Sequence, residues 1–425
     1  MTSRFWVVCS LLYILILLGL FTLGGSIILM GLPLLLYLAA GILFSPGEIK
    51  LEVTRTLSAD YISERKPITV ILRIKNIGQD ISEVLLEDIL PTGITLIEGQ
   101  TQRRLALAKG EIIEMSYTIQ AGRGKYRFEG LRTTATDSFE LFQTRSVIPT
   151  QGVLLVFPTI IKLHQFAIQP MQTRGFAGPI PARRGGSGIN FFGIRQYQPG
   201  DPPRRINWRV SLRRSEELFT NEFEQEAIAD VGIILDARSQ TNEVHGNIFE
   251  YSVMAAAALV EILLKQGHRV STLSYGFGIA RVYPGYGKVQ QHRIMRMLAQ
   301  VQPGINYALE SLRHLPTRLF PASSQLIILS PLGEDDREPL IRLRAQGYNV
   351  LVISPRIHPG EADLTPPFGD TVYRIVRVER QLLVNRLKRA GLEVVDWNIN
   401  HPLETALSTF SVRMMQHRRG VEVFS

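Results

Sequence analysis

The chain begins with two apolar segments, residues 5–23 and 27–44, that are separated only by Gly24, Gly25 and Ser26. Neither segment contains a charged residue, and each is close to the ~20 residues that a helix needs to cross a bilayer. A cleaved signal peptide would have a shorter apolar region and no second apolar segment behind it. The pattern therefore predicts a transmembrane helical hairpin over residues 1–49.

The pattern changes to short alternating stretches between residues 50 and 150. Apolar and polar residues alternate over 68–78, 82–99 and 111–137, and Gly, Pro, Asn and Asp interrupt them at regular intervals. A period of two residues is that of a strand with one buried face. We therefore expect an all-β, immunoglobulin-like sandwich over residues 50–150, a module that usually binds or spaces.

Residues 151–229 carry no long periodic segment, and Gly, Pro and Arg dominate. Bulky apolar residues nevertheless occur in 189–197 and 206–214, where their spacing favours short buried strands. This segment is predicted to form an ordered but irregular block.

Strands and helices alternate from residue 230 to 425. The continuous apolar run 231–238 is typical of a strand buried on both faces, and 348–354 is also predicted as a strand. Segments such as 248–267 and 375–391 have helical periodicity. A last helix is expected over 403–418. The alternation predicts a doubly wound α/β domain, whose ligands would lie beyond the carboxyl ends of the strands, near Asp236.

The positions of the positively charged residues support the predicted transmembrane hairpin and indicate its orientation in the membrane. The chain has a formal net charge of +9. Arg4 precedes the first apolar segment, and Lys50, Arg55 and Arg65 follow the second, so the positive-inside rule places both ends in the cytoplasm. The only cysteine, Cys9, lies within the first apolar segment, which excludes a disulfide framework and a cysteine-based zinc site.

The motifs of common enzymes are missing. The sequence has no His-x-x-x-His pair, no Gly-x-Ser-x-Gly elbow and no Gly-Lys-Ser/Thr phosphate loop. Between residues 183 and 214, eight arginines accompany a single acidic residue, Asp201. No groove-reading helix or stacking platform accompanies them, so we expect neither catalysis nor nucleic-acid binding.

The arginine-rich segment carries a spaced motif, Gly-x-x-Phe-x-Gly-x-Arg-x-Tyr-x-x-Gly-Asp followed by Arg-x-Ile-x-Trp. Through this motif the chain resembles the domain of unknown function 58 (DUF58) family, with Leu212 replacing the alanine usual after the tryptophan. The positions that match are Gly188, Phe191, Gly193, Arg195, Tyr197, Gly200, Asp201, Arg204 or Arg205, Ile206 and Trp208.

The order of elements after residue 230, with Asp236 ending the first strand, resembles a von Willebrand factor type A domain. That family holds a magnesium ion with Asp-x-Ser-x-Ser and with later Thr and Asp residues. Here Arg238 and Gln240 stand where the serines belong, Ile305 replaces the threonine, and Ser330 precedes Pro331 where Asp-Gly is usual. Only Asp236 and Ser239 remain as candidate ligands of a degenerate metal site, and a structural role for Asp236, with Arg238 supplying the positive charge, is the main alternative.

The DUF58 resemblance implies a non-enzymatic interaction or adaptor protein that works with a MoxR-type AAA+ ATPase. It further implies a multi-pass protein of the bacterial inner membrane, with no cofactor except a possible magnesium ion. The alternative is a metal-dependent adhesion or complex-maturation factor that binds a divalent ion at Asp236. The motif is either architectural or a docking surface for an acidic partner, and the candidate partner-binding residues are Arg195, Tyr197, Asp201, Arg204, Arg205, Trp208, Arg209 and Arg213.

Overall fold

The computed structural model describes residues 2–22, 25–45, 47–164, 166, 168, 180–213, 217–239, 248–276, 278–307, 311–357 and 369–408. The side chains of 180–192, 223–227, 369–373 and 376 are outside this description. The chain divides into two compact units, Met1–Phe157 and Pro158–Ser425. The first unit extends beyond the predicted boundary at residue 150, because the last strand of the sandwich continues to Phe157.

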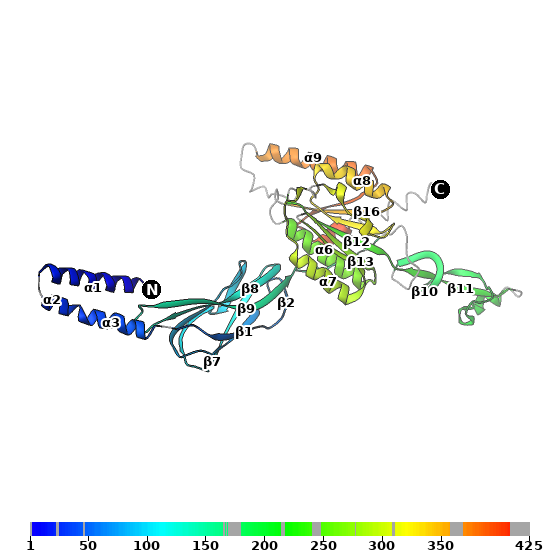
Figure 1. The fold of residues 1–425 in the computed structure, drawn as a ribbon. Coiled ribbons are helices and arrows are strands. Elements are labelled where there is room, and N and C mark those ends of the chain that lie inside the picture. The colour runs from blue at the N-terminus through cyan, green and yellow to red at the C-terminus, as the bar shows by residue number, and fades with distance from the viewer. Residues whose placement is uncertain are drawn as a thin grey trace. The chain divides into compact units, whose positions relative to one another are not determined.

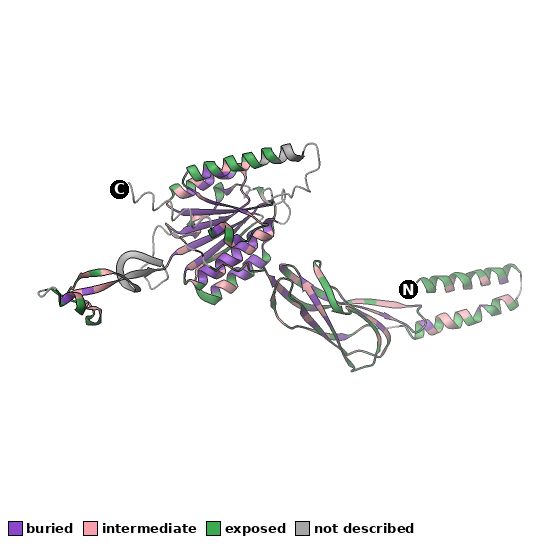
Figure 2. Cartoon of the chain, turned by 180° about the vertical axis from the view of Figure 1, so that it is seen from behind, coloured by how far each residue is buried: buried purple, intermediate pink, exposed green. Residues whose placement is uncertain are grey.

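The first unit starts with helices α1 (Ser3–Phe21), α2 (Gly25–Met30) and α3 (Leu32–Leu43), which occupy the two apolar segments. Ser3–Phe21 and Gly25–Leu43 are each 19 residues long and apolar enough to cross a membrane. Their side chains are mostly exposed, as the green helices of Figure 2 show. Helices α1 and α2 approach closely at Gly19, because a Cβ atom on this residue would clash with the side chain of Ile28. Small residues at such crossings are typical of packed membrane helices.

Two antiparallel sheets form the rest of this unit and confirm the predicted sandwich (Figure 1). One sheet has the order β1-β3-β7-β5 and the other β2-β9-β8-β4-β6, in which only the short β2 runs parallel to its neighbour. Buried and less buried residues alternate along β3, as the period of two requires. The strands are β1 (Leu51–Leu57), β2 (Tyr61–Ser63), β3 (Ile68–Asn76), β4 (Ile81–Asp88), β5 (Ile94–Gly99), β6 (Gln102–Leu107), β7 (Ile112–Ala121), β8 (Gly124–Thr136) and β9 (Gln143–Phe157).

The second unit opens with a two-stranded antiparallel sheet, β10 (Ile180–Gln196) and β11 (Phe219–Ala227). A 3₁₀ turn, η1 (Pro203–Arg205), and one helical turn, α4 (Trp208–Ser211), lie in the connection between them. The strand predicted over 189–197 is therefore confirmed, but its predicted burial is wrong for the described residues 193–197, none of which is buried. The strand predicted over 206–214 is wrong, because Asn207 caps a helical turn by accepting a hydrogen bond from the Val210 amide.

A six-stranded sheet of order β14-β13-β12-β15-β16-β17 forms the main body of the unit. Five of its strands are parallel, and only the edge strand β14 is antiparallel to its neighbour. The strands are β12 (Asp230–Ala237), β13 (Arg269–Gly276), β14 (Ile279–Gly285), β15 (Gln325–Leu329), β16 (Asn349–Arg356) and β17 (Glu393–Asn398). Nearly every residue of β12, β13, β15 and β16 is buried, which explains why these strands have continuous apolar sequences.

Helices cover both faces of this sheet (Figure 1). Helices α6 (Ile248–Lys265) and α7 (Gly287–Gln300) pack together on one face, and α8 (Arg337–Ala345) and α9 (Gly369–Arg389) lie on the other. Short 3₁₀ turns η4 (Leu312–His314), η5 (Thr317–Leu319) and η6 (Glu334–Asp336) occur in the loops. A final helical segment starts at Leu403, and the rest of the predicted 403–418 helix after Ser408 lies outside the described residues.

Candidate functional site

The motif residues between β10 and β11 are organised by one carboxylate. Arg195 donates two parallel hydrogen bonds to Asp201, from Nη1 to Oδ2 at 2.8 Å and from Nη2 to Oδ1 at 2.7 Å. The Gln198 amide donates to the same Oδ2 at 3.0 Å. This donor lies before Asp201 in the sequence, and the turn between them includes Gly200, whose φ is +110°.

These contacts make the base of the turn rigid. The hydrogen bond from Arg195, followed by that from Gln198, lowers the pKa of the Asp201 carboxyl, so its charged form is favoured. The Tyr197 hydroxyl donates to the Asp201 carbonyl oxygen at 3.3 Å. Three of the candidate partner-binding residues, Arg195, Tyr197 and Asp201, therefore bind one another, and the structure gives them an architectural role.

Beyond this base, apolar and basic side chains are exposed together. Trp208 is 59% exposed and Leu212 is 81% exposed. The exposed arginines Arg204, Arg209 and Arg213 have no ion pair in the described part of the chain. Arg205 is half-buried and its charge also lowers the pKa of Asp201. We call Arg204, Trp208, Arg209, Leu212 and Arg213 the hairpin tip.

The second candidate site lies where β12 ends, and its centre is the guanidinium of Arg238. Its Nε and Nη2 donate to the two carboxylate oxygens of Asp236, at 2.9 and 2.7 Å. Its Nη1 and Nη2 donate to the two oxygens of Asp336, at 2.9 and 2.8 Å. The arginine thus forms a two-sided bidentate bridge, the strongest geometry available to this side chain. We call Asp236, Arg238 and Asp336 the triad.

One oxygen of each aspartate accepts a further hydrogen bond from outside the triad. Ser330, just after β15, donates from Oγ to Asp236 Oδ2 at 2.6 Å, and the Gly333 amide donates to Asp336 Oδ2 at 2.8 Å. Ser239 is buried, and its amide donates to the Gly304 carbonyl at 3.0 Å. Sequence reasoning identified Asp236, Arg238 and Ser330 but missed Asp336. The acidic run Glu334-Asp335-Asp336 that follows a strand end is the signal that could have indicated it.

Burial dominates the electrostatics of the triad. Asp236, Arg238 and Asp336 are all less than 9% exposed. Burial raises the pKa of Asp336 although Arg238 opposes this effect. Burial also lowers the pKa of Arg238, but the hydrogen bonds and charges of the two aspartates outweigh it and raise the pKa overall, so the guanidinium stays charged.

The residues near Asp236 do not fit a divalent ion. Both Asp236 oxygens accept hydrogen bonds from Arg238, and the guanidinium occupies the space between the two carboxylates where a cation would have to bind. Among the described residues, no group of three His, Cys, Asp or Glu side chains could hold a metal. The site therefore contains a fixed internal cation.

The position of the triad in the sheet is that of a ligand site. Strand β12 pairs with β13 on one side and β15 on the other, so the chain order reverses at β12. In open α/β sheets, ligands bind beyond the carboxyl ends of the strands at such a point. The triad fills that place and joins the loops after β12 and β15.

Comparison with known proteins identifies a family model that matches part of this chain. Residues 193–392 match the family model described as "Protein of unknown function DUF58". The match confirms the DUF58 resemblance over this segment, which begins within the motif, at Gly193, and contains both candidate sites.

Two relatives cover different shares of the chain. "Uncharacterized protein YeaD" of Bacillus subtilis is 25% identical over 315 residues, which are 72% of this chain and 76% of that protein. "Uncharacterized protein Rv1480" of Mycobacterium tuberculosis is 29% identical over 191 residues, 42% of this chain and 57% of that protein.

Similarities to solved structures are remote. The CARDB domain of the PF1109 protein from Pyrococcus furiosus is 15% identical with a TM-score of 0.19, and covers 26% of this chain and 91% of that one. Proximal thread matrix protein 1 from the mussel byssus is 15% identical with a TM-score of 0.28, and covers 43% of this chain and 47% of that one. Scores of this size do not assign a fold.

Proposed function

We propose that this protein is a membrane-anchored, non-enzymatic adaptor that docks a partner protein on its hairpin tip. The observation that supports it is the exposure of Trp208 and Leu212 among arginines that have no ion pair in the described residues. Tryptophan and arginine are the side chains that most often dominate binding energy at protein interfaces.

The proposed partner is a MoxR-type AAA+ ATPase, as the DUF58 resemblance implies. The tip presents fixed positive charge, so the complementary surface on the ATPase is acidic. The Arg195–Asp201 bridge supports this role, because it holds the connection between β10 and β11 in one conformation and lowers the entropy cost of docking.

We further propose that residues 230–408 form a von Willebrand factor type A-like domain that works without a metal ion. The parallel sheet covered on both faces and the aspartate at the end of β12 support this interpretation. The guanidinium of Arg238 would supply the positive charge that an ion supplies in that family. The metal-dependent alternative is disfavoured because both Asp236 oxygens accept hydrogen bonds from Arg238.

The anchor in this proposal is the pair of apolar helical segments, Ser3–Phe21 and Gly25–Leu43. Arg4 before the first and Lys50 after the second favour a hairpin in the bacterial inner membrane, with the remainder of the chain in the cytoplasm. Such a multi-pass anchor would hold the docked ATPase at the membrane surface.

The test is a binding measurement between the full chain in neutral-lipid nanodiscs and a purified MoxR-type ATPase from the same cell. Trp208→Ala and the double variant Arg209→Ala with Arg213→Ala should each weaken binding at least tenfold. The matched control is Arg386→Ala with Arg389→Ala, which removes two exposed arginines from α9. Equal binding by all variants would refute the tip as the docking surface, and no binding by the unaltered chain would refute the ATPase as the partner.

The metal-dependent alternative is tested in the same assay. The adaptor alone is treated with EDTA and desalted before it meets the ATPase, so that the magnesium of the ATPase is untouched. Unchanged binding supports a metal-independent adaptor, and binding that is lost and then restored by magnesium supports the alternative.

A further inference from the structure

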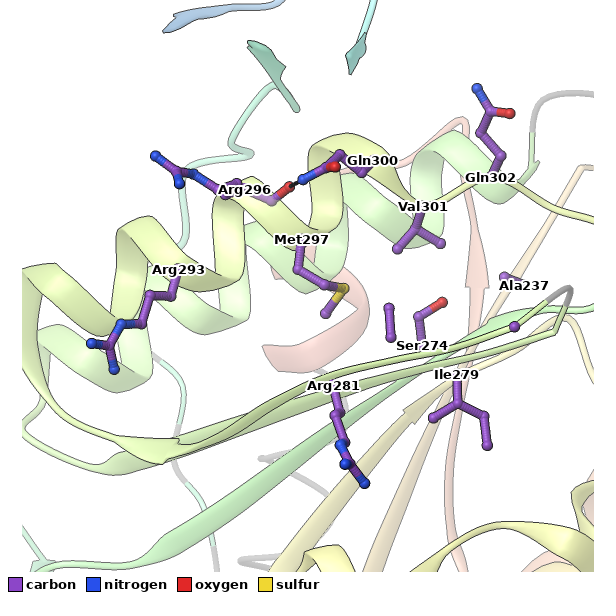
Figure 3. A pocket seen from close by; sticks show the side chains of 12 residues that line it. Ala237, Ser274, Ile279, Arg281, Arg293, Arg296, Met297, Gln300, Val301 and Gln302 are labelled. Carbon is purple, nitrogen blue, oxygen red and sulfur yellow. Dashed lines mark hydrogen bonds between the residues drawn. The ribbon is translucent and has the colours of Figure 1, made fainter.

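A cavity of about 440 Å³ lies beside the triad, between the edge of the sheet and α7. It begins at Ala237, the last residue of β12, and extends to Ser274 of β13, to β14 and to the second half of α7 (Figure 3). It therefore occupies the crevice at the carboxyl ends of parallel strands where ligands of α/β sheets bind. Neither the hairpin tip nor the triad uses it.

The lining of the cavity combines an apolar floor with a basic rim. Met297 and Val301 of the α7 region are buried and supply apolar surface, together with Ala280 of β14. Arg293 and Arg296 lie on α7, and their exposed side chains extend from this helix beside the cavity (Figure 3). Arg281 lies on β14, and its side chain extends away from α7.

None of these three arginines has an acidic partner in the described residues. Arg281 lies over the Tyr283 ring, with 5.3 Å from the guanidinium carbon to the ring centroid, and Arg296 Nη2 lies 3.5 Å from His292 Nε2. Two other basic groups of this region do have acidic partners, since Lys265 binds Glu261 and Arg269 binds Asp230. The rim arginines are thus available for anions from outside.

The sequence explains this lack of partners. Residues 262–309 contain six Lys or Arg residues and no Asp or Glu. Strands β13 and β14 and helix α7 all lie in this 48-residue segment, so any acidic partner of their basic side chains must come from another part of the chain. The usual mixture of signs on a soluble surface is missing here.

We propose that this cavity binds an acidic peptide segment of a partner protein, with one apolar side chain on the floor and flanking carboxylates on Arg293 and Arg296. Each arginine can bind a carboxylate through two donors, which a guanidinium does better than an ammonium. The segment belongs to a second interaction surface, separate from the hairpin tip, and the inference does not rest on the proposed adaptor function.

The chemistry of the lining favours a peptide over other anions. None of the described lining residues is aromatic, so the floor offers no stacking surface for a nucleobase. Lipid headgroups would reach the arginines of the rim but leave the apolar floor unused. A peptide uses both parts, because an aliphatic side chain and carboxylates can alternate along one extended strand.

The experiment uses the full chain in neutral-lipid nanodiscs and measures fluorescence anisotropy of a labelled peptide, Asp-Glu-Leu-Glu-Asp. Two further probes are its amide twin, Asn-Gln-Leu-Gln-Asn, and a version with Gly in place of Leu. We expect saturable binding of the first peptide and at least tenfold weaker binding of both others. Arg293→Ala with Arg296→Ala should weaken binding of the first peptide at least tenfold, while Arg386→Ala with Arg389→Ala on α9 should leave it within twofold.

Four results would overturn the proposal. The first is the absence of saturable peptide binding, and the second is equal affinity for the amide twin. The third is an equal loss of peptide affinity in the two double arginine variants. The fourth is tighter binding of a single-stranded oligonucleotide or of phosphatidylglycerol vesicles through Arg293 and Arg296. The last result would assign the cavity to nucleic acid or to lipid. None of these outcomes depends on whether an ATPase binds the hairpin tip.

Discussion

Each of the two units contains a buried arginine that binds aspartate. The two sites differ in the number of aspartates for each arginine. In the sandwich, Arg55 binds Asp88, donates to the Thr150 carbonyl and lies 4.7 Å from the centroid of the Phe128 ring. Tyr117 donates its hydroxyl to the other oxygen of Asp88. One positive and one negative group balance here, and both side chains are fully buried.

The triad of the α/β unit has one arginine for two aspartates. It also joins the loops that follow the central strands β12 and β15, whereas the Arg55–Asp88 pair lies inside the sandwich and joins β1 of one sheet to β4 of the other. A balanced buried pair can be replaced by apolar residues at little cost, but removal of one partner leaves a buried charge. The comparison indicates that the sandwich pair serves packing, while the triad holds a charged loop structure that apolar residues could not reproduce.

The largest effect is expected for Arg238→Ala, because it leaves Asp236 and Asp336 facing each other without a counter-ion. The free energy of unfolding of the α/β unit should fall by about 3–5 kcal/mol. Urea unfolding followed by the fluorescence of the buried Trp397 measures this in a background with Phe at positions 6 and 208. A loss below about 1 kcal/mol would show that the guanidinium does not hold the loops together.

Acid should partly rescue this variant. Burial already raises the pKa of Asp336 above its ordinary value of 3.8, and loss of the opposing Arg238 raises it further. A carboxyl whose folded pKa is raised binds its proton more tightly in the folded state, so stability falls as pH rises from about 4 through that pKa. The variant should therefore lose less stability at pH 4 than at pH 7, relative to the unaltered chain at each pH.

The next largest effect is expected for Asp88→Asn in the sandwich. Arg55 would keep its contacts with Thr150 and Phe128 but lose its counter-ion, at a cost of about 3 kcal/mol. Hydrogen exchange of peptides from β7 and β8 reports this unit alone, with peptides from β12 as the internal reference. The triple variant Arg55→Met, Asp88→Leu and Tyr117→Phe should recover stability to within about 1 kcal/mol, and failure to recover would show that the charges themselves are needed.

The smallest effect is expected for Arg313→Ala, which removes an arginine from an exposed cluster. Arg313 and Arg342 both bind Glu338, at 2.5 and 3.1 Å, and all three side chains are more than half exposed. Water already solvates these groups, so the loss should stay below about 1 kcal/mol in the same urea assay. A loss as large as that of Arg238→Ala would mean that the number of ion pairs, and not their burial, decides stability.

The sequence predicted most of the fold because burial periodicity is a local signal. Continuous apolar runs became the parallel strands β12, β15 and β16, and alternation became the two sheets of the sandwich. The prediction failed at 206–214, where the cap at Asn207 and the exposure of Trp208 override the bulky apolar residues. A single capping hydrogen bond is enough to decide a segment of this length.

The triad shows the limit of sequence reasoning at a site. The sequence contained Asp236 with Arg238 two residues later, and so indicated that an arginine could supply the charge of an ion. It could not show that Asp336, 98 residues from Arg238, completes the site, because that contact depends on β12 and β15 being neighbours in the sheet. For the same reason the cavity beside α7 had no counterpart in the sequence prediction.

The sequence alone determined the two apolar segments, the class of each unit, the DUF58 motif and the positive charge of residues 262–309, since each depends on residue type and spacing. The tertiary structure decided which charges are neutralised. It paired Arg195 with Asp201 and Arg238 with two aspartates, and it left the arginines around the cavity without acidic partners among the described residues. Charge pairing is a property of distances in space, and these are set by the packing of strands and helices rather than by neighbours along the chain.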